Sequence, residues 1–121
     1  MKIDFIADTN FLIYIHEGND IVEPFLDYSF GISFISEVEL LGHKGIAPNE
    51  ELKLKNLLND CFLIEWSIKL KEQTINLKRK YSIKLPDAIV ASTCLIFKTP
   101  LITADKGFTK IKELDLVLIE V

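Results

Sequence analysis

The chain has 121 residues, of which 49% are hydrophobic and 26% are charged, a composition that suits one folded domain with a buried core and argues against disorder. Its net charge of −4 gives no general attraction to nucleic acid or anionic lipid, although positive charge can still gather locally. The two cysteines, Cys61 and Cys94, occur without a CxxC pair or a histidine cluster, so we expect two buried thiols rather than a zinc site or a disulfide framework.

Short apolar runs alternate along the chain with longer segments of helical pattern. In residues 49–60, for example, Leu54, Leu57 and Leu58 repeat at the spacing of one helix face. Pro24 is expected to disturb the second helix. In chain order, the expected elements are a strand at 3–7, helices at 10–17 and 20–29, a strand at 30–35, helices at 37–44 and 49–60, a strand at 61–66, helices at 68–81 and 87–98, and strands at 100–103 and 116–120.

This alternation predicts an α/β fold, a three-layer α/β/α sandwich in which helices cover both faces of a mostly parallel sheet. Because no linker rich in Pro, Gly or Ser interrupts the chain, we expect residues 1–121 to form a single domain. In such sheets the ligand site lies beyond the carboxyl ends of the strands.

Four acidic residues lie at the expected junctions between apolar elements: Asp8, Glu39, Asp87 and Asp105. Each has an ordinary structural explanation, since acids are favoured in the first turn of a helix and as N-caps. Ser36 and Glu39, for instance, have the spacing of a capping box. Together, however, the four acids are expected at the same edge of one sheet, which makes a shared site the stronger hypothesis.

Electrostatics limits what such a site can be. Two ionised carboxylates about 6 Å apart repel each other by roughly 3 kcal/mol at an effective dielectric constant of about 20. Four of them in one pocket therefore take up protons or surround a cation. Oxygen ligands favour a hard divalent ion, so we expect Mg²⁺ or Mn²⁺, which can activate a water and stabilise charge on a phosphodiester.

The segments around these acids resemble the four acidic motifs of PIN-domain ribonucleases, and especially of the VapC-like toxins of toxin–antitoxin pairs. The resemblance runs over essentially the whole chain, and the ordered set is far more specific than any one motif. It implies a PIN-like α/β/α sandwich and metal-dependent hydrolysis of RNA. The matching segments are DTNFLIYI (8–15), SEVELLG (36–42), LPDAIVAS (85–92) and LITADKGF (101–108).

The resemblance also assigns roles to individual residues. Asp8, Glu39, Asp87 and Asp105 match the catalytic, metal-binding acids. The polar residues at the matching supporting positions are Thr9, Asn10, Ser36 and Thr103, of which Ser36 is expected to cap a helix. The resemblance further implies an antitoxin partner whose C-terminal segment covers the acidic site, and it implies a homodimer.

A basic segment precedes Asp87. Lys78, Arg79, Lys80 and Lys84 could bind the phosphates of RNA, or they could simply form a solvated helix face, and the sequence leaves both readings open. His16 and His43 are single histidines near helix ends, for which no catalytic role is expected.

The leading hypothesis is a Mg²⁺- or Mn²⁺-dependent endoribonuclease acting as the toxin of a toxin–antitoxin pair. One alternative is a non-catalytic module of the same fold that holds a basic peptide in its acidic pocket. Another is an aspartyl-phosphate phosphotransferase, although that chemistry commonly uses DxD and the second residue after Asp8 is Asn10. A cytoplasmic location without membrane contact is expected, because the most apolar stretch, 88–97, is too short to span a bilayer and acids interrupt the N-terminal segment.

Overall fold

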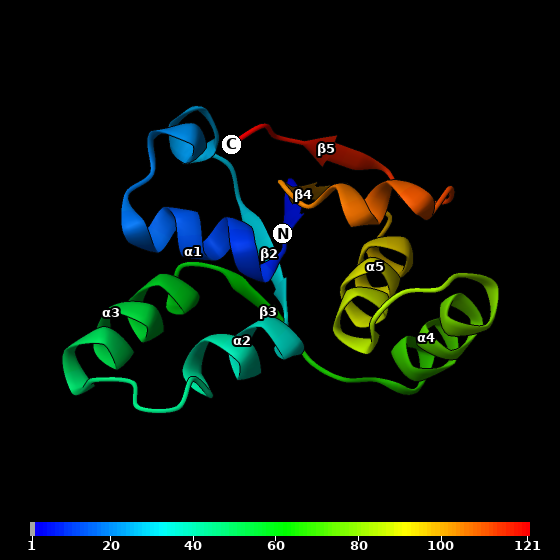
Figure 1. The fold of residues 1–121 in the computed structure, drawn as a ribbon, viewed down its shortest axis with the longest axis horizontal. Helices are drawn as coiled ribbons and strands as arrows, with labels where there is room; N and C mark the ends of the chain where they lie inside the picture. Colours follow the sequence, from blue (N-terminus) through cyan, green and yellow to red (C-terminus); the bar gives the residue numbers. More distant parts are fainter. Residues whose placement is uncertain (1) are drawn as a thin grey trace.

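The computed structural model describes residues 2–121 and contains a five-stranded sheet in the order β3-β2-β1-β4-β5 (Figure 1). Each pair of neighbouring strands in this sheet is parallel. The strands are β1 (Phe5–Ala7), β2 (Phe30–Ser33), β3 (Phe62–Ile64), β4 (Leu101–Thr103) and β5 (Leu116–Leu118). The helices are α1 (Thr9–Glu17), α2 (Phe34–Leu41), α3 (Pro48–Asn59), α4 (Ile68–Lys80) and α5 (Leu85–Phe97), with 3-10 helices η1 (Asp20–Phe25) and η2 (Lys106–Lys110).

Helices cover both faces of the sheet (Figure 1). On one face, α1, η1 and α3 enclose an apolar core that includes Phe11, Leu12 and Leu58. On the other face, α4, α5 and η2 enclose a second core around Leu77 and Val90. Helix α2 contacts both α3 and α5 and so lies between the two groups. The expected three-layer sandwich is confirmed, and the sheet is parallel at every pairing rather than only mostly so.

The predicted sequence of elements is confirmed with shifts at their ends. The expected helix at 20–29 is the shorter 3-10 helix Asp20–Phe25, which contains Pro24, a residue without the amide hydrogen that an α-helix interior needs. The expected strand at 30–35 ends at Ser33, whose side chain accepts a hydrogen bond from the Ile35 amide and so caps α2. The capping role expected for Ser36 is therefore wrong, because α2 has already begun two residues earlier.

Only one of the two cysteines matches the expectation of a buried thiol. Cys94 is buried in α5, whereas Cys61 is only partly buried where α3 leads into β3. Both are free thiols, and burial raises the pKa of Cys61 to about 11, which leaves it protonated at neutral pH.

The order of the strands determines where a site can form. The chain begins in the central strand β1, moves outward through β2 and β3, and then returns to the other side of β1 to form β4 and β5. A crevice opens at such a reversal, beyond the carboxyl ends of β1 and β4. Asp8 follows β1 directly, and Asp105 lies just beyond β4. In residues 2–121, the helices are too short or too polar to cross a membrane.

Candidate active site

The four acids predicted from the sequence lie around one small pocket of about 130 Å³, although they come from four different parts of the chain. Asp8 caps α1, Glu39 lies within α2, Asp87 lies in the first turn of α5 and Asp105 caps η2. The remaining residues that line the pocket are Thr9, Asn10, Pro86, Val90 and Phe108.

Asp8 is the most buried of the four, with only 5% of its surface exposed. Its Oδ1 accepts a hydrogen bond of 2.8 Å from the Phe11 amide, which fixes the start of α1, and its Oδ2 accepts one from the Thr103 hydroxyl. The capping explanation considered for Asp8 is therefore correct. It does not compete with a role in the pocket, because carboxylate oxygens have further lone pairs.

Thr103 connects the first acid to the last. Its hydroxyl donates to Asp8, and its oxygen accepts a hydrogen bond of 2.9 Å from the backbone amide of Asp105. Asp105 in turn accepts from the Gly107 amide at 2.8 Å and so starts η2. Thr103, one of the supporting residues expected from the sequence, thus links the ends of β1 and β4.

Thr9 and Ser36 make the corresponding connection to Glu39. The Thr9 hydroxyl donates to Glu39 Oε1 at 2.6 Å, and its oxygen lies 3.0 Å from the buried Ser36 hydroxyl, with which it shares a second hydrogen bond. Ser36 therefore supports the position of Thr9, rather than capping the helix as expected. Asn10 lines the pocket, but its side chain is exposed and makes no hydrogen bond to another side chain among residues 2–121.

The electrostatic consequence of crowding is visible at two of the acids. Burial raises the pKa of Asp8 from 3.8 to about 6, against the opposing hydrogen bonds from Thr103 and Phe11, and the charges of Asp105 and Asp87 raise it further. Burial also raises the pKa of Asp87, and the neighbouring charges of Asp105 and Glu39 add to the effect. The ion pairs found in residues 2–121 include none of the four acids. The pocket therefore carries negative charge that the protein itself does not neutralise.

Basic side chains near the pocket are few, and sequence reasoning found only some of them. The charges of Lys84 and Lys110 lower the pKa of Asp87, so both ammonium groups lie within electrostatic reach of it. Lys110 was not among the candidates, although its position five residues after Asp105 was a usable signal. Three lysines are engaged in local structure: Lys78 donates to the Ile83 carbonyl, Lys110 donates to the Ser82 carbonyl at 3.1 Å, and Lys80 pairs with Glu113.

The donor set fits a hard divalent cation in kind and in charge, since four carboxylates line the pocket and Asp8 is protonated more readily than a normal aspartate. The carboxylates surround the pocket without converging on one point, however. Within residues 2–121, no group of three or more His, Cys, Asp or Glu side chains is already arranged to hold a metal ion. The hydrogen bonds described above direct several carboxylate oxygens to Thr and backbone amide groups, so metal binding requires side-chain rotations, above all at the exposed Glu39.

Three pocket residues, Pro86, Val90 and Phe108, were not predicted as part of the site. Val90 lies about one helical turn after Asp87 on the same face of α5, so it lines the same pocket. Phe108 lies in η2 and also lines the pocket. These side chains close the pocket with apolar surface, which strengthens electrostatic interactions inside it.

Comparison with known proteins identifies the family. A model of the PIN domain matches residues 5–114. Among solved structures, a toxin–antitoxin complex from Klebsiella pneumoniae contains a chain with 27% sequence identity and a TM-score of 0.83, with 98% of this chain and 100% of that chain covered. VapBC2 from Rickettsia felis, bound to a DNA fragment from its promoter, gives 22% identity, a TM-score of 0.80 and coverage of 98% and 100%.

A third structure, DNA-bound VapBC from Salmonella typhimurium, gives 19% identity and a TM-score of 0.83, with 96% of this chain and 98% of that chain covered. No curated protein sequence matches the chain. The protein therefore shares its fold, over nearly its full length, with the matching chains of these three assemblies. Since the family match spans four of the five strands, β1 to β4, together with the helices and all four acidic residues, the chain belongs to the PIN-domain family.

Proposed function

We propose that the protein is an endoribonuclease that depends on Mg²⁺ or Mn²⁺ and hydrolyses phosphodiester bonds of RNA. The observation that carries this proposal is that Asp8, Glu39, Asp87 and Asp105 line a single pocket and form no ion pair within residues 2–121. Membership of the PIN-domain family supports the same chemistry. Asp8 and Asp87, whose raised pKa values reflect burial and mutual repulsion, gain most from a cation.

In the proposed mechanism Asp8, Glu39, Asp87 and Asp105 would hold the ion, whose chemistry would be to activate a water and to stabilise negative charge on the phosphate. Thr103 and the Phe11 amide hold the buried Asp8 in one orientation, which reduces the reorganisation needed at this acid. Glu39, which is exposed and hydrogen-bonded to Thr9, is the acid that would turn to reach the ion. Lys84 lies near Asp87 and binds a phosphate of the RNA strand that flanks the scissile one.

We further propose that the protein is the toxin of a toxin–antitoxin pair, acts in the cytoplasm as a homodimer, and is held inactive by an antitoxin. The support comes from three similar structures, which are described as a toxin–antitoxin complex and as two VapBC assemblies. Of these, only the chain from Klebsiella pneumoniae exceeds one quarter identity.

The central test is cleavage of a panel of labelled structured and unstructured RNAs in Mn²⁺, in Mg²⁺ and in EDTA. We expect cleavage in either metal, none in EDTA, and a loss of about 10³-fold or more in Asp8→Asn and Asp87→Asn. Asp27→Asn, an exposed substitution of the same kind outside the pocket, serves as the control and should retain full activity. Cleavage that persists in EDTA or in Asp8→Asn would remove the proposed mechanism.

Calorimetry distinguishes the proposed enzyme from the alternative that this protein is a non-catalytic, peptide-binding module of the same fold. The enzyme should bind Mn²⁺, and Asp8→Asn should weaken that binding. Tight binding of a basic peptide without measurable metal affinity would favour the module instead. The aspartyl-phosphate alternative is disfavoured by the motif, because the second residue after Asp8 is Asn10 rather than an aspartate, and trapping Asp8 with a phosphate mimic would revive it.

A further inference from the structure

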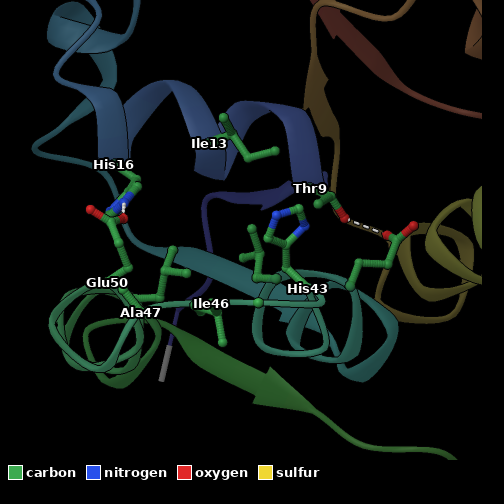
Figure 2. Close-up of a pocket in the computed structure, with 11 residues that line it drawn as sticks. Thr9, Ile13, His16, His43, Ile46, Ala47 and Glu50 are labelled. Carbon is green, nitrogen blue, oxygen red and sulfur yellow. Dashed lines mark hydrogen bonds and ion pairs between the residues drawn. The ribbon is translucent and has the colours of Figure 1, made fainter.

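A second and larger pocket, of about 540 Å³, adjoins the acidic one (Figure 2). It lies among α1, α2, α3 and the loop that joins the last two helices. Thr9 and Glu39, which are hydrogen-bonded to each other, line both pockets, so the two pockets share a wall. A chain segment bound at the acidic site therefore has this space directly beside it.

The chemistry of the larger pocket differs from that of the acidic one. Its floor is apolar and contains Ile13, Leu40 and Leu54. Polar groups lie at its two ends: Thr9 and its bond to Glu39 at one, and His16 with Glu50 at the other (Figure 2). In the part of the chain that the structure describes, no Lys or Arg lines this space.

We propose that this pocket binds one nucleobase of the RNA, from a nucleotide next to the scissile phosphate, and that it prefers guanine. This inference rests on the proposed nuclease function and adds a base-selective subsite to it. A volume of about 540 Å³ is within the range of small-ligand pockets, about 300–1,000 Å³. A nucleobase has two apolar faces and a polar edge, which matches an apolar floor with polar groups at its ends.

Glu50 supplies the specificity. His16 Nε2 lies 2.6 Å from Glu50 Oε2, and this hydrogen bond lowers the pKa of the Glu50 carboxyl, which is therefore an anionic acceptor at neutral pH. A carboxylate can accept two adjacent N–H donors. Of the four RNA bases only guanine presents such a pair on its Watson–Crick edge, as N1–H and N2–H. The His43 ring, which points from the end of α2 toward α1 in Figure 2, offers a flat face against which a base can stack.

The charge of the pocket argues for a base rather than a phosphate. Glu39 and Glu50 line it without a Lys or Arg among the described lining residues, so an anionic group entering it would be repelled. The phosphates instead remain at the acidic pocket, where a cation and the nearby Lys84 compensate their charge. One nucleotide can thus place its backbone at the acids and its base between α1 and α3.

Binding of free nucleosides tests the subsite without metal and without cleavage. Guanosine, adenosine, cytidine and uridine are titrated separately into the ¹⁵N-labelled protein in EDTA, and the amide resonances of Gly45 and Ile46 are followed. Guanosine should shift both resonances saturably and bind more tightly than the other three by about fivefold or more. The four nucleosides carry no phosphate, so any preference arises from the base.

Two substitutions separate recognition from folding. Glu50→Gln keeps the side-chain shape but removes the second acceptor oxygen, and it should reduce the preference for guanosine by about fivefold or more. Ala47→Phe fills the pocket and should abolish nucleoside shifts. Ala47 precedes α3 in an extended conformation and provides no side-chain cap, so the larger side chain does not disturb the helix start. Glu51→Gln makes the same charge change one residue further along α3, outside the pocket, and should bind as the wild type does.

The same variants are then assayed on RNAs that differ only in the bases flanking the cleavage site, in Mn²⁺. Glu50→Gln should lose discrimination between guanine and the other bases, whereas the control Glu51→Gln should keep both the preference and the cleavage rate of the wild type. Cleavage with base preference unchanged in both Glu50→Gln and Ala47→Phe overturns the subsite but leaves the nuclease intact. An arginine-bearing amphipathic peptide that shifts Gly45 and Ile46, when no nucleoside does, overturns it in favour of a protein-docking site.

Discussion

At the scale of single residues, Asp8 combines two roles that the sequence presented as alternatives. It caps α1 through the Phe11 amide, and it lines the acidic pocket at the end of β1. The capping bond and the Thr103 hydroxyl both favour the ionised form, yet burial outweighs them and raises the pKa to about 6. A buried carboxylate in this state destabilises the folded protein near neutral pH unless a cation compensates it.

We therefore expect Asp8→Asn to stabilise the metal-free protein. The folded state holds the Asp8 proton more tightly than the unfolded chain, whose pKa is 3.8, so the contribution of Asp8 to stability is greatest below pH 3.8 and declines as pH rises to about 6. The full decline is about 3 kcal/mol. Asparagine keeps the helix cap but cannot accept the Thr103 hydroxyl in the same way, which leaves a net gain of about 1–2 kcal/mol at pH 7.

Urea unfolding in EDTA between pH 4 and pH 8 measures this effect. The wild type should lose stability over the range from about pH 4 to pH 6, and Asp8→Asn should show a flatter profile than the wild type or the exposed control Asp27→Asn. A variant that is less stable than the wild type at pH 7 would mean that Asp8 acts mainly as a cap.

At the scale of elements, the ends of strands and helices organise the site. Ser33 ends β2 and caps α2, Asp8 caps α1, and Asp105 caps η2. A short polar side chain thus begins each of these helices at the same edge of the sheet. Sequence reasoning located these junctions but misplaced one by a few residues, because Ser33 and Ser36 are both plausible caps on pattern alone. The structure distinguishes them, because the Ile35 amide donates to Ser33 whereas Ser36 contacts Thr9.

Strands β1 and β2 pack so closely at Gly31 that a methyl group there is expected to destabilise the fold. Gly31 pairs with Ile6, and a Cβ at this position would lie 2.8 Å from Ile6 Cδ1. Gly31→Ala should therefore lower the free energy of unfolding by about 1–3 kcal/mol, measured by urea denaturation. Ile6→Val removes Cδ1, so the double variant should be more stable than the sum of the two single effects. Strict additivity would show that this contact does not limit the packing.

Two basic residues, at the end of α4 and in the segment that follows it, are expected to differ in their contribution to RNA binding. Lys84 lies near Asp87, whereas Lys80 is paired with Glu113. In an Asp8→Asn background, which prevents cleavage, Lys84→Gln should weaken RNA binding and reduce the slope of log K against log salt by about 0.7–0.9. Lys80→Gln should change that slope less. Equal effects of the two substitutions would favour a diffuse basic surface over a defined phosphate contact.

At the scale of the whole molecule, an exposed apolar region on the edge of the sheet is a candidate surface for the proposed homodimer. Trp66 is 56% exposed and Leu85 is 56% exposed, and both line one shallow pocket next to β3. Leu85 begins α5, two residues before Asp87, so a second copy bound here would lie close to the acidic pocket. Large exposed apolar side chains of this kind are typical of interaction surfaces.

Sedimentation equilibrium tests this surface. The wild type should behave as a dimer at micromolar concentration, and Trp66→Ser should weaken association by about tenfold or more, as expected for an aromatic residue at the centre of an interface. Leu26→Ser, which changes another exposed apolar side chain, in the segment between η1 and β2, is the control. A dimer that survives Trp66→Ser unchanged would place the interface elsewhere.

The sequence by itself determined the α/β alternation, the parallel sheet and the identity of the four acids, because hydrophobic periodicity and motif order are local properties of the chain. It did not determine that Ser36 supports Thr9, that Lys110 lies near Asp87, or that a second pocket adjoins the first between α1 and α3. Those features depend on contacts between segments distant in the chain, and they arise only when the sheet brings the carboxyl ends of β1, β2 and β4 together and the helices pack over it. Side-chain packing in three dimensions, which leaves no local pattern, decides them.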